Sequence, residues 1–121
     1  MSADPYSARV RELFAAPAHA GDLPGAKAVY TADQGVRLQL AATAADGAIT
    51  GMRFKAWGCP HLIAAAEAAC AMLEGQPVSD LVGWTVSDLM QNLPVPVEKT
   101  GRILVLEDTV RSLGQGFRGG T

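Results

Sequence analysis

The stretch VRLQLAATAADGAITGMRFKAWGCPHLIAAAEAACAMLEG, residues 36–75, decides the fold of this chain. Its first half alternates apolar and polar residues with the period of two that is typical of a half-buried strand. The dipeptide Asp46-Gly47 in its middle is a strong hairpin signal. We therefore expect two antiparallel strands, with these side chains on the buried face: Val36, Leu38, Leu40, Met52, Phe54 and Ala56.

After Gly58 the apolar period lengthens to that of a helix. Pro60 suits the first helical position, which makes Cys59 the expected N-cap, and Gly75 suits the end of the helix. The apolar stripe of this predicted helix is made of small and branched residues: Leu62, Ile63, Ala66, Ala69, Cys70 and Leu73.

The rest of the chain predicts three or four shorter elements around this centre. The expected segments are a helix over 5–15, an irregular connector over 16–26, a short strand over 26–30, one or two short helices over 80–93, an extended proline-rich connector over 93–101, a helix over 102–113 and a flexible glycine-rich tail over 115–121. This order predicts a single α+β domain, residues 1–121, with a small antiparallel three-stranded sheet and helices packed on one face.

Composition and charge exclude several classes of protein. The 121 residues carry a net charge of −2 and no basic stripe, so we expect no nucleic-acid binding. No apolar run reaches membrane-spanning length, because Glu67 and Glu74 interrupt the longest one. The N-terminus lacks an apolar signal core, and two cysteines make no disulfide framework. We therefore expect a cytoplasmic protein.

Cys59 is the strongest candidate for a residue with a chemical role. At a helix start it faces free backbone N–H groups and the positive end of the dipole, and both favour the thiolate. His61, in the same turn, is a candidate metal ligand when neutral. The alternative is that Cys59 is a small buried apolar residue and His61 an ordinary residue of a helix start. We expect Cys70 to be buried and inert, and His19 to lie at the surface.

The segment FKAWGCPHLIAAAEAACAMLEG resembles the centre of the NifU/IscU-type iron–sulfur cluster assembly scaffolds, in which a strand ending F-K-x-x-G-C runs into a helix of small residues. The resemblance extends to YSARVRELFAAPAHAGDL at the start and to LPVPVEKTGRILVLEDTVRSL near the end. The second of these is similar to the family's L-P-P-V-K chaperone-recognition segment and the cysteine-bearing helix that follows it.

The resemblance also implies which positions would carry the ligands. The family holds a cluster or a zinc ion with three cysteines, assisted by an aspartate. Cys59 matches the second cysteine, whereas Ala32 stands at the first and Arg102 at the third. Gln34 stands at the aspartate position, with Asp33 one residue away. One of three ligand cysteines is therefore retained, and Asp33 and His61 are its nearest candidate helpers.

The resemblance implies a role in iron–sulfur cluster assembly and no enzymatic activity. In one hypothesis the protein binds iron or a [2Fe-2S] cluster, with zinc as a further candidate, through Cys59, with ligands completed by His61 and Asp33 or by a second chain in a homodimer. In the alternative it holds no cluster. It then docks a cysteine desulfurase, or another assembly or chaperone protein, and accepts persulfide sulfur on Cys59.

Overall fold

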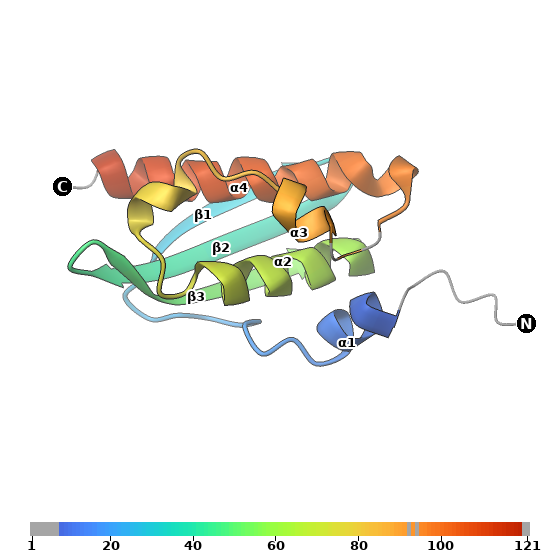
Figure 1. The fold of residues 1–121 in the computed structure, drawn as a ribbon, viewed down its shortest axis with the longest axis horizontal. Coiled ribbons are helices and arrows are strands. Elements are labelled where there is room, and N and C mark those ends of the chain that lie inside the picture. The colour runs from blue at the N-terminus through green and yellow to red at the C-terminus, as the bar shows by residue number, and fades with distance from the viewer. Residues whose placement is uncertain (1–7, 92, 94, 120–121) are drawn as a thin grey trace, which may run out of the picture.

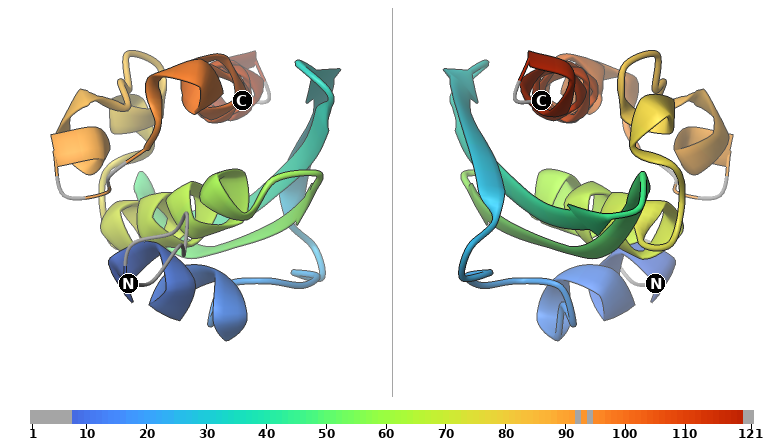
Figure 2. Two further views of the ribbon diagram at one scale, coloured as in Figure 1. Left: turned by 90° about the vertical axis from the view of Figure 1, so that its right-hand side faces the viewer. Right: turned by 90° about the vertical axis from the view of Figure 1, so that its left-hand side faces the viewer.

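The computed structural model describes residues 8–91, 93 and 95–119 of the chain. Its elements, in chain order, are α1 (Ala8–Ala15), β1 (Lys27–Asp33), β2 (Val36–Ala45), β3 (Ala48–Trp57), α2 (Pro60–Leu73), the 3-10 helix η1 (Val78–Leu81), α3 (Ser87–Gln91), the 3-10 helix η2 (Val97–Lys99) and α4 (Thr100–Gly119). The strands form one antiparallel sheet in the order β1-β2-β3. The sheet curls around α2 and α4, as Figures 1 and 2 show, which confirms the predicted α+β class.

The hairpin of β2 and β3 forms as its alternation predicts. The side chains of Val36, Leu38 and Leu40 are buried, while Arg37 between them is exposed. At the turn, Asp46 and Gly47 both have positive φ, 55° and 78°, which is the backbone of a type I′ turn. The turn therefore fixes the register that places the apolar face of both strands towards the helices.

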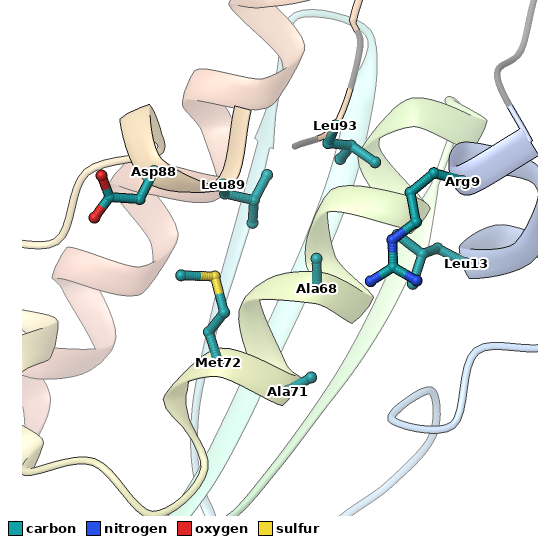
Figure 3. A pocket seen from close by; sticks show the side chains of 8 residues that line it. All are labelled: Arg9, Leu13, Ala68, Ala71, Met72, Asp88, Leu89 and Leu93. Carbon is teal, nitrogen blue, oxygen red and sulfur yellow. The ribbon is translucent and has the colours of Figure 1, made fainter. Parts of the chain in front are cut away.

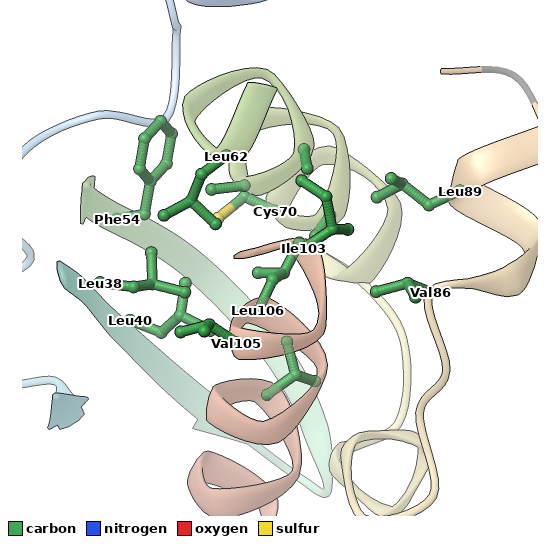
Figure 4. Packing of buried hydrophobic residues seen from close by; sticks show 14 of the residues in the cluster. Leu38, Leu40, Phe54, Leu62, Cys70, Val86, Leu89, Ile103, Val105 and Leu106 are labelled. Carbon is green, nitrogen blue, oxygen red and sulfur yellow. The ribbon is translucent and has the colours of Figure 1, made fainter. Parts of the chain in front are cut away.

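Helix α2 is the central element of the core. Cys59 is its N-cap with an extended backbone, and Pro60 occupies the first helical position, both as predicted. The small side chains of α2 are buried on most of its circumference, which lets the sheet and α4 approach closely. Figure 4 shows Cys70 pointing from α2 into the core, with Leu62 beside it and Ile103 of α4 nearby.

Helix α4 is longer than the sequence predicts. A helix over 102–113 followed by a tail from residue 115 is wrong for 115–119, because the helix runs from Thr100 to Gly119. Two contacts explain the difference. Phe117 packs against the core, and the missing side chain of Gly114 lets the helix lie directly on η1. Residues 120 and 121 lie outside the described part of the chain.

Two other predicted segments differ in extent from the observed ones. The predicted strand over 26–30 extends to Asp33, because β1 pairs with β2 along seven residues. The extended connector over 93–101 is wrong for 97–101, where η2 and the start of α4 form. The predicted first helix, 5–15, is observed as α1, and residues 5–7 lie outside the described residues. Within the described ranges, no helix has the length and apolar character needed to span a bilayer.

Candidate functional site

Three segments that are distant in sequence meet at one end of the molecule. They are the β1–β2 turn, the junction between β3 and α2, and the start of α4, all at the right-hand end of Figure 1. A Cβ on Gly58 would lie 2.9 Å from the carbonyl oxygen of Gly35, and a Cβ on Gly101 would lie 3.1 Å from Oε1 of Gln34. Glycine is thus required at position 58, where φ is also +108°. We call residues 32–35, 58–61 and 99–102 the Cys59 corner.

Cys59 is buried, with 2% of its surface exposed. Its carbonyl oxygen accepts the first hydrogen bond of α2, from the N–H of Ile63 at 3.1 Å, whereas its side chain makes no capping hydrogen bond. The thiol is therefore not exposed at the helix start, in agreement with the alternative that Cys59 is a small buried residue. The reason is that the β1–β2 turn closes over the Gly58 backbone next to Cys59, which the sequence pattern does not reveal.

His61 is buried beside two cations. Burial lowers the pKa of His61 below its ordinary value of 6.5, and the charges of Lys99 and Arg102 lower it further, although Glu98 opposes them. Arg102 is half-buried, and its charge acts on His61. The sequence pattern does not identify Lys99 as part of the site. The one feature that could have indicated it is its position three residues before Arg102.

The remaining predicted positions lie on the β1–β2 hairpin and are exposed. Ala32 is on β1 opposite Arg37. Asp33 uses Oδ1 to accept the N–H of Gln34 at 2.8 Å, which stabilises the turn. Gln34 has a positive φ of 53° and lays its side chain against Gly101. The fold thus brings to the same corner the three positions that the resemblance assigns to the family's cysteines.

The described residues of one chain do not assemble a metal centre at this corner. Among the residues that the structure describes, no group of three or more histidine, cysteine, aspartate or glutamate side chains could hold an ion. Cys59 and His61 share the start of α2, and Asp33 is engaged in its own turn. The assignment of Cys59, His61 and Asp33 as metal ligands stays a prediction.

Two residues outside the corner bear on the predictions. Cys70 is fully buried, as expected, and burial together with the charges of Glu67 and Glu74 raises the pKa of its thiol well above the ordinary range. His19 is not a free surface residue. It is half-buried and hydrogen-bonded to both Glu67 and Glu74, partners that lie 48 and 55 residues away and that no local pattern could indicate.

The surface also carries a cavity of about 410 Å³ between α1, α2 and α3. Figure 3 shows its apolar floor, formed by Ala68, Ala71 and Met72 of α2, with Leu89 of α3 and Leu13 of α1 at the sides. None of the residues that line it belongs to the Cys59 corner. The cavity therefore plays no part in the chemistry discussed for that corner.

The structure is a small antiparallel sheet curled around two helices, with three chain segments meeting at one cysteine. Residues 5–113 match the family described as the NifU-like N terminal domain, and the chain belongs to that family. This confirms the resemblance stated from the sequence.

Solved structures agree on the fold. A NifU-like N-terminal protein from Brucella abortus is 14% identical, with a TM-score of 0.75 and 95% of each chain covered. A candidate iron–sulfur cluster assembly scaffold protein of the SUF system from Fervidobacterium islandicum is 13% identical, with a TM-score of 0.68 over 88% of this chain and 94% of that one. A hypothetical protein is 20% identical, with a TM-score of 0.59 and 88% of each chain covered. No curated protein matches the sequence.

Proposed function

We propose that this protein takes part in iron–sulfur cluster assembly by accepting sulfur on Cys59, and that it does not hold a cluster within a single chain. The observation that carries the proposal is the composition of the Cys59 corner. It has one thiol at a helix start, two cations that act on the neighbouring His61, and, among the described residues, no group of three metal-binding side chains placed to hold an ion. On this proposal the protein is a sulfur carrier and not an enzyme.

The electrostatics of the corner favour an anion over a cation. Lys99 and Arg102 act on His61, two residues from Cys59, so an iron ion brought to the corner would be repelled. A corner with this charge suits an anionic sulfur species better than a metal cation. A guanidinium cannot give up its proton to become a ligand, so the change to arginine at position 102 is unfavourable for metal binding.

The transfer step is a thiol–disulfide-type exchange. The Cys59 thiolate attacks the outer sulfur of the persulfide that a cysteine desulfurase carries on its own cysteine. The new S–S bond forms at Cys59 as the S–S bond in the desulfurase breaks, and the desulfurase cysteine leaves as a thiolate. Because Cys59 is buried, the corner has to open when the partner docks.

Mass spectrometry of the intact protein tests the proposal. After incubation with a cysteine desulfurase and cysteine, the wild type is expected to gain the mass of a sulfur atom. Cys70→Ser is the matched control, because Cys70 is the other cysteine and is buried in the core. We expect the gain to persist in Cys70→Ser and to vanish in Cys59→Ser. An unchanged wild-type mass, or a gain that survives in Cys59→Ser, would refute it.

A second candidate is iron or a [2Fe-2S] cluster shared between two copies of the chain. The placement of Cys59 and His61 on the first turn of α2 favours it, because two copies would supply four donors. The low pKa of His61 keeps a ring nitrogen available near neutral pH. Anaerobic addition of iron and sulfide should then give a coloured dimer. A colourless monomer would exclude this candidate.

Docking of an assembly chaperone is a further part of the proposal. Residues 93–99 correspond to the segment that resembles the family's chaperone-recognition motif, and Val97 in it is 87% exposed. An exposed branched apolar side chain on a short 3-10 helix is available to a partner. Binding of the chaperone should weaken in Val97→Asp and remain in Val95→Ala, since Val95 packs partly against the core.

A further inference from the structure

Residues 16–26, which connect α1 to β1, run along the outer edge of β3. We call this segment the strap. The N–H of Phe54 donates to the carbonyl oxygen of His19, and the N–H of Gly21 donates to the carbonyl oxygen of Phe54, each at 2.9 Å. The strap therefore covers an edge of the sheet that would otherwise expose unpaired backbone groups.

The side chain of His19 fastens the strap to α2. Nδ1 lies 2.5 Å from Oε2 of Glu67, and Nε2 lies 2.9 Å from Oε1 of Glu74. The backbone N–H of His19 also donates to Oε1 of Glu67 at 2.7 Å. Glu74 in turn accepts from Nη1 of Arg53 at 2.9 Å. Two carboxylates and two basic groups thus form one compact network.

This geometry suits only one protonation state of His19. A protonated imidazole has two N–H donors and can donate to both carboxylates, whereas a neutral ring has one. In the neutral state a ring nitrogen lone pair would face a carboxylate oxygen at hydrogen-bonding distance, which is repulsive. Glu67 keeps only 8% of its side chain exposed, so water cannot readily replace the lost donor.

The strap also forms one wall of a hollow beside the Cys59 corner. The hollow has a volume of about 290 Å³, and its lining includes Ala20 and Gly21 of the strap, Trp57 at the end of β3 and Ile63 on the first turn of α2. Trp57 and Ile63 flank Cys59 in the chain. Movement of the strap would therefore change the shape of the surface next to the start of α2.

We propose that the strap is a pH-sensitive latch, closed when His19 donates to both Glu67 and Glu74 and released when His19 loses its proton. The other charged or titratable groups that face this network are Arg53, which is paired with Glu74, and the neutral thiol of Cys70. The ion pair between Asp22 and Lys55, at 2.5 Å, holds the strap further along.

The direction of the pH dependence follows from the charges. Burial lowers the pKa of His19, but the hydrogen bonds and charges of Glu67 and Glu74 outweigh it, so the folded-state pKa lies above the ordinary value of 6.5. A group whose pKa is raised by folding contributes its full stability below the unfolded value. The latch should thus be closed below pH 6.5 and open as the pH rises through the folded-state pKa of His19.

NMR spectroscopy of the intact chain tests the latch. The chain has two histidines, so the ring resonance that is missing from His19→Gln identifies His19 in the wild type. We expect His19 to titrate above 6.5. We also expect the exchange protection of the Gly21 and Phe54 amides to fall about tenfold as the pH rises from about 6 to about 9, after correction for intrinsic exchange.

Asp22→Asn is the matched control, because it removes a strap contact that does not involve His19. In this variant the exchange protection of the Gly21 and Phe54 amides should start lower than in the wild type. It should then fall by the same factor as the pH rises. In His19→Gln the pH-dependent step should be absent. Titration of His19 at or below 6.5 would overturn the proposal, as would strap amides in the wild type whose protection does not change with pH. Both wild-type measurements stand even if His19→Gln does not fold.

Discussion

The contact between Gly114 of α4 and η1 allows a quantitative test of the fold. An ideal Cβ on Gly114 would lie 2.8 Å from Cβ of Leu81, 2.9 Å from the backbone nitrogen of Val82 and 3.0 Å from the carbonyl carbon of Leu81. These distances are well inside normal van der Waals contact. Because backbone atoms of η1 and the residue after it are involved, rotation of a side chain cannot relieve the overlap.

Two opposing effects decide the outcome of Gly114→Ala. Overpacking of a close contact costs about 1–3 kcal/mol, and we expect the upper half of that range because backbone has to move. Replacing a helical glycine with alanine stabilises the helix by roughly 1 kcal/mol. The free energy of unfolding should therefore fall by about 1–2 kcal/mol.

Gly116→Ala is the matched control in the same helix. Its nearest neighbour would be Cδ of Lys27 at 3.2 Å, the end of a flexible side chain that can move away. Only the helix propensity gain remains, so this variant should gain up to about 1 kcal/mol. Urea unfolding of wild type and both variants measures the difference. If Gly114→Ala is as stable as Gly116→Ala, α4 does not pack on η1 as described.

Three further predictions concern the site and its surroundings. Ala32→Cys combined with Arg102→Cys should restore iron–sulfur cluster binding, seen as visible absorption after anaerobic reconstitution; a colourless double variant would show that these positions do not face Cys59. Burial raises the pKa of Glu74, but hydrogen bonds from a backbone N–H, an imidazole and a guanidinium outweigh it and place the pKa below 4.5. Because folding lowers the pKa of Glu74, its ionised carboxylate stabilises the fold at pH values above the pKa of the unfolded state. Glu74→Gln should therefore be less stable than wild type near neutral pH, and the difference in free energy of unfolding should shrink as the pH falls below 4.5. A difference that does not change with pH would contradict this. In Cys59→Ser, the thiol of Cys70 should react with iodoacetamide only after unfolding, and native-state labelling would show that the core is open.

The sequence predicts those parts of the fold whose signals are local. The alternation from Val36 to Leu40 and the Asp46-Gly47 turn specify the hairpin, because each depends on neighbouring residues alone. The Cys59-Pro60 pair likewise predicts the start of α2. Residues 115–119 are predicted as a glycine-rich tail for the same reason, because the contact of Gly114 that holds this end of α4 comes from η1, far away in the chain.

The site could be predicted only in part. The positions of Ala32, Cys59 and Arg102 follow from the family resemblance, and the structure brings them to one corner. The burial of Cys59 and the influence of Lys99 on His61 depend on tertiary contacts that leave no periodic or spacing signal. The hydrogen bonds of His19 could not be predicted either, because its partners lie on α2 and just beyond its end, far away in the sequence.

Analysis of iron, acid-labile sulfide and sulfane sulfur in anaerobically purified protein tests the central claim most directly. The account predicts sulfane sulfur on Cys59, lost in Cys59→Ser, with neither iron nor acid-labile sulfide in stoichiometric amount. Iron and acid-labile sulfide in equal amounts, each matching the number of chains, would contradict it and would show that this corner completes a cluster despite Ala32 and Arg102.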